Sequence, residues 1–304
     1  MNASTQSGSM HDTPRPRTIV ITGASSGFGL LTAATLIEQG DNVVATMRDV
    51  DTRNANVARD LMMLAQASSG SLSIVELDVT QDASVNKAAA AILAQGPVDV
   101  LINNAGVMNI GVTEAYSLDE MKAQFEVNTF GPARVAKAFL PAMRARHSGL
   151  VISVSSLAGR LVFPFFGAYC ASKFALEALF EAYRYELSSF GVDCVIIEPG
   201  PFDSGLLPRS PSPSDLALVA TYGDIGQIPE AMKANFQQSY DGPDAPRSQD
   251  VADAIVALIR QEGRRPLRTV VMPKGLDLGV DRLNAAVSGI QNDLLTGMQF
   301  ADMI

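Results

Sequence analysis

Seven short runs of apolar, largely β-branched residues recur along the chain, with segments of helical pattern between them. A run of this kind is typical of a strand that is buried on both faces, as in a parallel sheet. We therefore predict seven strands, over residues 17–22, 42–47, 71–78, 98–102, 150–156, 192–198 and 267–272.

The main helical segments lie between these runs, at residues 30–39, 57–67, 82–94, 118–146, 174–190 and 249–261. Strands that alternate with helices imply a parallel sheet with helices on both faces. Right-handed crossovers then make this sheet doubly wound. The predicted fold class is α/β: a Rossmann-type, doubly wound, parallel seven-stranded sheet in a single domain with an insertion.

We place this domain at residues 15–275, with one segment that interrupts it and one that extends it. Residues 205–247 contain six prolines and several serines, with short helices expected at 215–220 and 229–238. Because long structureless segments are usually functional or disordered, we interpret 205–247 as a substrate lid insertion. Residues 276–304 form an amphipathic, methionine-rich extension that could close the fold, contact another subunit or line a pocket.

Composition limits the kinds of partner. With 47% hydrophobic and 18% charged residues, the chain can bury a sizeable core. The net charge of −9 argues against nucleic acid, because no basic stripe is available to neutralise phosphates. Residues 1–14 resemble a disordered tail rather than a signal peptide. The sequence contains no run of about 18 apolar residues, so we expect no membrane span. A cytoplasmic location is expected.

The chain offers few metal ligands. Cys170 and Cys194 lie within apolar runs without metal-ligand spacing, which favours buried thiols in a reducing compartment. The two histidines, His11 and His147, cannot supply a histidine-based metal site. We therefore expect no metal centre.

A glycine-rich turn follows the first predicted strand and precedes a helix. It contains Gly23, Gly27 and Gly29, and this layout points free backbone N–H groups at a phosphate. The spacing differs from the general Gly-x-Gly-x-x-Gly pattern. A glycine turn alone is a weak signal, but its place between this strand and this helix favours a nucleotide.

The end of the second strand indicates which nucleotide. An acidic residue there would bind a ribose 2′-hydroxyl and repel a 2′-phosphate. This chain instead has Met47 followed by Arg48, whose guanidinium can bind a phosphate. Asp49 and Asp51 leave open the alternative that Arg48 only pairs with one of them. We expect NADP(H) to be favoured over NAD(H).

Tyr169 and Lys173 are four residues apart at the start of a helical run, so they lie on one face of the helix. A cation close to the phenol would lower the tyrosine pKa and make it a plausible general acid or base. The alternative is a half-exposed tyrosine beside a solvated lysine. The turn at residues 103–106, after the fourth strand, would face the same ligand crevice.

These motifs, in this order, resemble those of the short-chain dehydrogenase/reductase family, in its branch of roughly 250 residues, over residues 17–274. The resemblance implies a catalytic tetrad of Asn128, Ser156, Tyr169 and Lys173. Ser156 is preferred to Ser155 because of its spacing from the tyrosine. The cofactor-binding residues implied are Gly23, Ser25, Ser26, Gly27, Phe28, Gly29, Arg48, Asp78, Val79, Asn104, Ala105, Gly106, Tyr169, Lys173, Pro199, Gly200 and Ser204.

The resemblance also implies roles for these residues. Asp78 would contact the adenine, and Lys173 the nicotinamide ribose. Asn128 would bind a water that links Lys173 to solvent. Ser204 stands where the family usually has Thr and keeps the hydroxyl that would bind the nicotinamide amide.

The expected activity is that of an NADP-preferring ketoreductase or alcohol dehydrogenase, as a homodimer or homotetramer. Residues 163–177 resemble the branch with 17β-hydroxysteroid and retinol dehydrogenases, and residues 161–171 contain no Lys, Arg, Asp or Glu. We therefore expect a bulky, neutral, apolar ketone or alcohol. A non-catalytic cofactor-sensing or scaffold protein of the same fold is the main alternative. A sugar-nucleotide epimerase is disfavoured, because those enzymes usually carry a different glycine motif and a larger C-terminal domain.

Overall fold

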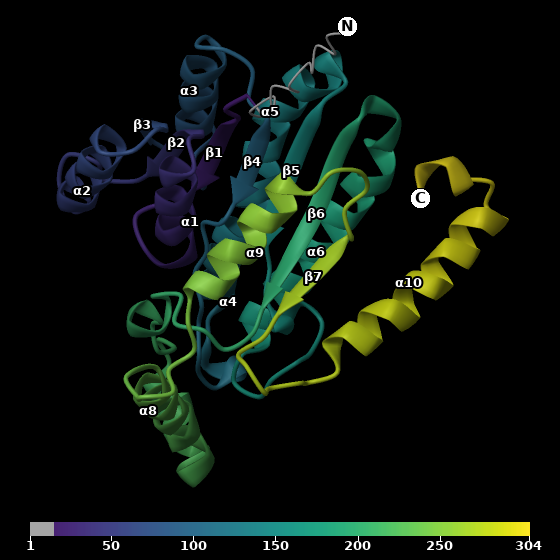
Figure 1. The fold of residues 1–304 in the computed structure, drawn as a ribbon. Coiled ribbons are helices and arrows are strands. Elements are labelled where there is room, and N and C mark those ends of the chain that lie inside the picture. Colours follow the sequence, from purple (N-terminus) through teal and green to yellow (C-terminus); the bar gives the residue numbers. More distant parts are fainter. Residues whose placement is uncertain (1–14) are drawn as a thin grey trace, which may run out of the picture.

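A seven-stranded, wholly parallel sheet forms the centre of the molecule, with strand order β3-β2-β1-β4-β5-β6-β7 (Figure 1). The computed structural model describes residues 15–304, so the expected tail at 1–14 lies outside the described residues. The predicted fold class is confirmed, with small shifts at the strand ends. The strands are β1 Thr18–Thr22, β2 Asn42–Met47, β3 Ser71–Glu76, β4 Val100–Asn103, β5 Gly149–Val154, β6 Val192–Pro199 and β7 Arg268–Val271.

Helices cover both faces of this sheet. On one face lie α1 (Gly27–Glu38) and α9 (Gln249–Arg260), with α2 (Ala55–Gln66) beside the β3 edge. On the other lie α3 (Asp82–Leu93), α5 (Gly131–Arg146) and α6 (Gly167–Glu186). Successive residues of β1 point to opposite cores: Ile19 and Ile21 pack into one and Val20 into the other. Burial on both faces explains why the strand sequences are continuously apolar.

The strand order reverses next to β1. The chain builds β1, β2 and β3 outward, then returns to pair β4 on the other side of β1, with Ile19 opposite Val100. At such a switch point, the loops that follow the two strands diverge and leave a crevice at their carboxyl ends. The glycine turn and residues 103–106 are those loops.

The single helix expected at residues 118–146 is instead three pieces. Helix α4 (Leu118–Phe125) is followed by a π-helical turn, η2 (Glu126–Phe130), and then by α5. Ser117 and Glu120 form a capping box that fixes the start of α4. The π turn was not predicted, because the helical sequence pattern continues across residues 126–130. Such turns are frequent at functional sites.

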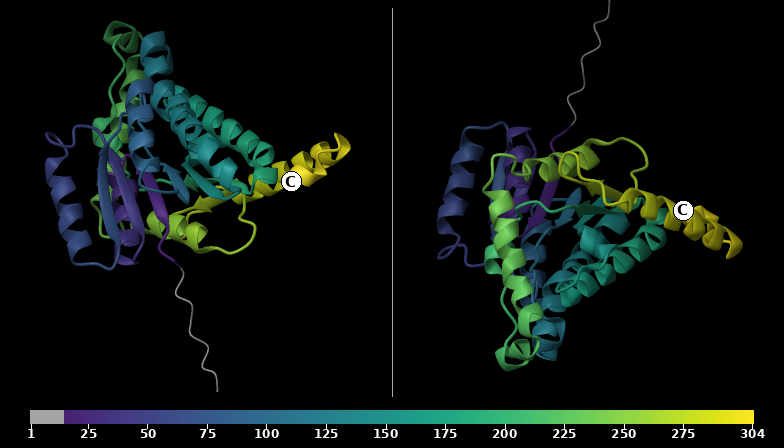
Figure 2. Two further views of the ribbon diagram at one scale, coloured as in Figure 1. Left: turned by 90° about the horizontal axis from the view of Figure 1, so that it is seen from above. Right: turned by 90° about the horizontal axis from the view of Figure 1, so that it is seen from below.

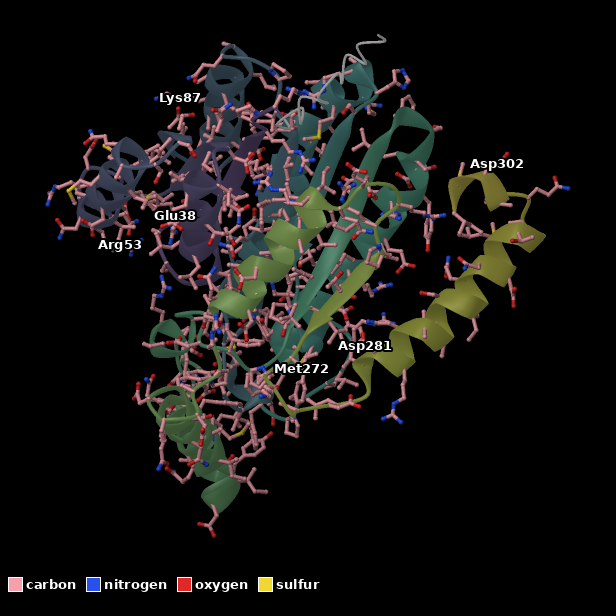
Figure 3. The ribbon with its side chains drawn as sticks, viewed as in Figure 1. Glu38, Arg53, Lys87, Met272, Asp281 and Asp302 are labelled. Atoms are coloured by element: carbon pink, nitrogen blue, oxygen red, sulfur yellow. The ribbon has the colours of Figure 1, made fainter. Side chains whose placement is uncertain are left out.

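The lid and the C-terminal extension lie outside the sheet layers. The lid contains η5 (Leu207–Arg209), α7 (Leu216–Thr221), η6 (Gly223–Gln227) and α8 (Ile228–Tyr240), at the end of the sheet where the strands finish (Figure 1). Helix α10 (Val280–Gly297) and the turn η7 (Ala301–Met303) extend outward from the β7 side in both views of Figure 2. Asp281 and Asp302 mark the two ends of this arm (Figure 3).

Short 3-10 turns complete the chain: η1 Thr113–Ala115, η3 Leu157–Gly159 and η4 Ser188–Phe190. Ser248 directly precedes α9 but makes no capping bond with its side chain, and its hydroxyl instead donates to the carbonyl of Asp203 at 2.6 Å. Over residues 15–304, no helix combines the length and apolar character needed to cross a membrane.

Candidate active site

Tyr169 and Lys173 lie in the first two turns of α6 and are buried, with 7% and 4% of their surfaces exposed. The Lys173 Nζ lies 5.9 Å from the centre of the Tyr169 ring. It donates a hydrogen bond to the carbonyl of Val154, at the end of β5, at 2.8 Å. The alternative of an exposed tyrosine beside a solvated lysine is therefore wrong.

Burial dominates the acidity of this pair. It raises the pKa of Tyr169 to about 12, and a hydrogen bond with Ser156 opposes that rise. Burial also lowers the pKa of Lys173 to about 8, against the opposing charge of Glu177. The expectation that the tyrosine pKa is depressed is corrected for the protein alone, because removing the phenol from water raises its pKa by more than the hydrogen bond with Ser156 lowers it.

The structure separates the two candidate serines. Ser156 begins the turn η3, shares the hydrogen bond with Tyr169, and its Oγ accepts from the Ala158 N–H at 3.1 Å. Ser155 points elsewhere: its hydroxyl donates to Glu177 Oε1 at 2.7 Å and is buried. Of the two serines, Ser156 is therefore the one that is hydrogen-bonded to the tyrosine.

Asn128 lies in the π turn, fully buried behind the site. Its Oδ1 accepts from the Val107 N–H at 2.9 Å, while its Nδ2 donates to the Val107 carbonyl and to Ser172 Oγ. These bonds join the loop after β4 to α6. A Cβ placed on Gly106 would approach Asn128 Oδ1 and Lys173 Nζ at 3.5 and 3.9 Å, so the three residues are neighbours.

The glycine turn is packed against two other loops. Gly23 and Gly27 have φ of +67° and +55°, where a side chain is strained. A Cβ on Gly27 would come within 2.2 Å of the Ser204 carbonyl, and one on Gly29 within 2.3 Å of Asn104 Nδ2. Because glycine permits this approach, the N-terminus of α1 opens toward the crevice, where its free N–H groups suit a phosphate.

A cavity of about 680 Å³ connects the glycine turn to Tyr169. Of the predicted site residues, Gly27, Gly29 and Asn128 pack behind its wall and do not line it. The wall is formed by Gly23, Ser25, Ser26, Phe28, Arg48, Asp78, Val79, Asn104, Ala105, Gly106, Ser156, Tyr169, Lys173, Pro199, Gly200 and Ser204.

The charge of the cavity is opposite to that of the chain. Apart from the tyrosines Tyr169 and Tyr240, the ionisable residues of its wall are four cations and one carboxylate, Asp78. The net charge of the whole chain, in contrast, is −9. The cations are Arg48, Arg53, Lys173 and Arg209. A donor set of this kind fits a ligand with several phosphate charges, and the residues present therefore fit a dinucleotide.

Arg48 lies near a carboxylate other than the two that the sequence suggested, Asp49 and Asp51. Its Nη1 lies 3.9 Å from Asp78 Oδ2, while Asp49 pairs with Arg53 at 2.9 Å. Arg53, labelled beside α2 in Figure 3, also lines the cavity. Arg53 was not predicted from the sequence, although it is a second arginine only five residues after Arg48.

Beyond Tyr169 the cavity becomes apolar. Phe163, Phe166, Leu207 and Phe236 line it, and Phe166 meets Phe236 edge to face at 6.5 Å. Leu206 of the lid also lines it, but Leu216 and Ile225 of the same segment are 66% and 53% exposed and lie outside it. Lining residues that the sequence analysis did not name include Met108, Met232, Tyr240 and Leu278. Leu278 shows that the C-terminal extension contributes to the pocket wall.

Among residues 15–304, no group of three or more His, Cys, Asp or Glu side chains could hold a metal ion. Cys170 and Cys194 are free and buried.

Known proteins resemble this chain over most of its length. A family model described as short chain dehydrogenase matches residues 17–213. The uncharacterized oxidoreductase YusZ of Bacillus subtilis is 35% identical over 266 residues, 85% of this chain and 90% of YusZ. Retinol dehydrogenase 8 of Bos taurus is 37% identical over 83% of this chain and 80% of its own. Human 17-beta-hydroxysteroid dehydrogenase type 1 is 36% identical over 80% and 74%.

Solved structures agree with the fold. A short-chain dehydrogenase from Streptomyces avermitilis matches with a TM-score of 0.72 and 31% identity, over 93% of this chain and 97% of that one. A metagenomic short-chain oxidoreductase in complex with NADP matches at 0.66 and 27%, over 85% and 97%. A short-chain dehydrogenase/reductase from Burkholderia phymatum in complex with NAD matches at 0.70 and 26%, over 91% and 95%.

Proposed function

This chain belongs to the short-chain dehydrogenase family, and from that premise we propose that it interconverts a carbonyl compound and a secondary alcohol with a nicotinamide dinucleotide. The observation that carries the proposal is the single cavity that joins the glycine turn to the Ser156, Tyr169 and Lys173 cluster. When bound, the dinucleotide supplies or accepts the hydride.

Tyr169 is the proton donor in the direction of reduction. Its raised pKa of about 12 keeps the phenol protonated at neutral pH, which is the form that can donate to a carbonyl oxygen. The Ser156 hydroxyl, already hydrogen-bonded to that phenol, stabilises the negative charge that develops on the same oxygen. The ammonium of Lys173 adds favourable charge beside both groups. Asn128 fixes the loop after β4 against α6, and so orients the wall on which Lys173 lies.

NADP(H) is the preferred cofactor in this proposal. Arg48 and Arg53 flank the end of the cavity near β2, where no carboxylate occupies the position after the strand. Asp78, the cavity's carboxylate, lies 3.9 Å from Arg48, a distance that leaves the guanidinium open to a phosphate. Related structures contain NADP in one case and NAD in another, so the preference depends on these arginines.

The substrate is a bulky, neutral, apolar ketone or alcohol. Around Tyr169 the cavity wall is aromatic and aliphatic, and its carboxylate, Asp78, belongs to the opposite end. Two of the relatives are named for retinol and a hydroxysteroid, which agrees with a pocket of this character. Buried apolar surface should therefore supply most of the substrate affinity.

A steady-state assay with NADPH and a panel of ketones of increasing apolar size tests this function. We expect the wild-type kcat/KM to rise with apolar size. We expect Tyr169→Phe to lose at least about 100-fold in activity, because it lacks the proton donor, while its NADPH affinity stays close to wild type. A non-catalytic sensor would bind NADPH and reduce no ketone, and a preference for small or anionic carbonyls would contradict the substrate class.

A further inference from the structure

A guanidinium from the lid lies against the glycine turn. Arg209 ends η5, and its Nη2 donates to Ser26 Oγ at 2.9 Å, across 183 residues of sequence. Its Nε donates to the Gly205 carbonyl at 2.7 Å. Ser26 is the residue directly before α1, so Arg209 lies at the helix N-terminus that faces the cavity.

Arg209 differs from the other cavity arginines in having no anionic partner. Arg48 lies 3.9 Å from Asp78, and Arg53 pairs with Asp49 at 2.9 Å. Within residues 15–304, no carboxylate oxygen lies within 4.0 Å of an Arg209 nitrogen. The chain has 32 acidic residues, yet none of the described ones neutralises this cation. An unpaired guanidinium beside free helix N–H groups is the arrangement that an anionic ligand completes.

The position of Arg209 is fixed from both sides of its turn. Leu207, two residues earlier, is buried in the apolar cluster that contains Phe166 and Tyr169. Ser210, the next residue, accepts a hydrogen bond from the Ile110 N–H at 3.0 Å. The turn η5 therefore contacts two parts of the cavity. Arg209 contacts the glycine turn, and Leu207 packs into the apolar wall near Tyr169.

We propose that Arg209 binds the pyrophosphate of the dinucleotide and that this contact couples cofactor binding to the position of the lid. The inference rests on the proposed function. A pyrophosphate bound at the N-terminus of α1 would give the Arg209 guanidinium, which now donates to the neutral Ser26 Oγ, a charged oxygen to bind instead. Because Leu207 moves with the same turn, the cofactor orders the wall against which the substrate packs.

Binding measurements on the full chain test the contact. Titrations that follow NADPH and NADH fluorescence should show Arg209→Gln weakening both cofactors by about tenfold, because both carry the pyrophosphate. Adenosine 2′-monophosphate carries neither phosphate of the pyrophosphate, and its affinity, measured by calorimetry, should change little. Arg48→Ala is the matched control: it should weaken the binding of NADPH and of the 2′-monophosphate but leave NADH binding nearly unchanged.

Hydrogen exchange of residues 205–247 tests the coupling. NADPH should slow exchange there in the wild type and, at matched saturation, much less in Arg209→Gln, while Arg209→Lys, which keeps the charge, should give an intermediate result. Thermal unfolding of each unliganded variant verifies that it is folded.

The possible outcomes separate this inference from the proposed function. Wild-type affinity of Arg209→Gln for both cofactors would overturn the inference, and so would a loss confined to NADPH. Faster lid exchange without loss of affinity would make Arg209 only a structural link. A wild type that binds neither NADPH nor NADH would overturn the proposed function itself, and the inference with it.

Discussion

Lys173 shows at the residue scale how burial and charge oppose each other in this site. Its ammonium is almost inaccessible to water, and burial lowers its pKa to about 8. Glu177, one helical turn further along α6, acts in the opposite direction and favours the charged form. The lysine therefore stays largely protonated at neutral pH and loses its charge as the pH rises through about 8.

Arg48 carries the prediction on cofactor choice. Arg48→Ala should weaken NADPH binding by about 1–3 kcal/mol, the size of a charge-assisted contact, and leave NADH binding nearly unchanged. Fluorescence titrations with the two cofactors measure this difference directly.

Arg53→Ala serves as the comparison for Arg48→Ala. Because Arg53 is already paired with Asp49, its removal should have the smaller effect on NADPH. Equal losses for NADPH and NADH in Arg48→Ala, or a wild type that prefers NADH, would show that Arg48 does not read the 2′-phosphate.

Single residues also show where sequence reasoning ends. The spacing to Tyr169 favours Ser156 over Ser155 as the tyrosine's partner, and in the structure Ser156 is hydrogen-bonded to the tyrosine while Ser155 bonds to Glu177. Arg209 could not be placed at the glycine turn, because 183 residues separate it from Ser26. Its position depends on how the lid folds over the crevice, and no local pattern encodes that.

At the scale of elements, a buried cluster of charges joins α6, β6, β7 and α10. Arg268 of β7 lies 2.9 Å from Glu177 Oε2 and 3.3 Å from Glu198 Oε1. Asn284 of α10 donates to Glu198 Oε2 at 2.6 Å and accepts from Arg160 Nε at 2.8 Å. The cluster reaches the loop after β5 through Glu177, which accepts from Ser155. It therefore anchors the projecting helix to the core behind the candidate site.

Glu198 makes this cluster sensitive to pH. Burial, together with the charge of Glu177, raises its pKa from 4.5 to about 8. The folded protein thus retains a proton that the unfolded chain releases, so the free energy of unfolding should fall as the pH rises from about 4.5 to 8. Glu198→Gln is neutral and nearly isosteric. It should remove this dependence and stabilise the protein at pH 8, relative to wild type, by an amount on the order of 2 kcal/mol.

Urea unfolding at a series of pH values measures that effect. Glu38→Gln, an exposed acid on α1 (Figure 3), is the control and should leave the pH dependence of wild type intact. A Glu198→Gln variant that loses stability equally at pH 5 and pH 8 would show that the carboxylate, and not its protonated form, supports the fold.

Most helices and strands could be predicted from the sequence. The features that could not be predicted depend on contacts between distant residues. No glycine or proline interrupts residues 126–130, so a sequence pattern alone cannot reveal the π turn that buries Asn128. Its stabilising bonds, to Val107 and Ser172, come from other elements. The charge cluster escaped prediction for the same reason, because Glu177, Glu198, Arg268 and Asn284 meet only in the tertiary structure.

At the scale of the whole molecule, the alternation of apolar runs with helices was enough to predict the parallel sheet, because each strand is buried on both faces. The glycine turn and the residues after β4 could likewise be assigned to one crevice, since both follow strand ends at the switch point. The arrangement of the lid, α8 and α10 was not predictable, because few apolar positions fix them to the sheet.

The strand order also has a consequence for how fast the protein folds. Residues 18–76 build the β1–β3 half, and the other half must join it where Ile19 meets Val100. Pairings between such distant residues are slow to form. The crevice lies on this seam, so a dinucleotide can bind only after the halves have joined.

A ligand of that kind cannot act as a folding template. Saturating NADPH should therefore leave the refolding rate of the chain unchanged, while it lowers the unfolding rate, because all of its stabilisation belongs to the native state. Stopped-flow dilution from urea, with and without NADPH, measures both rates. A refolding rate that increases with NADPH concentration would mean that the β1–β3 half binds the dinucleotide before β4 arrives.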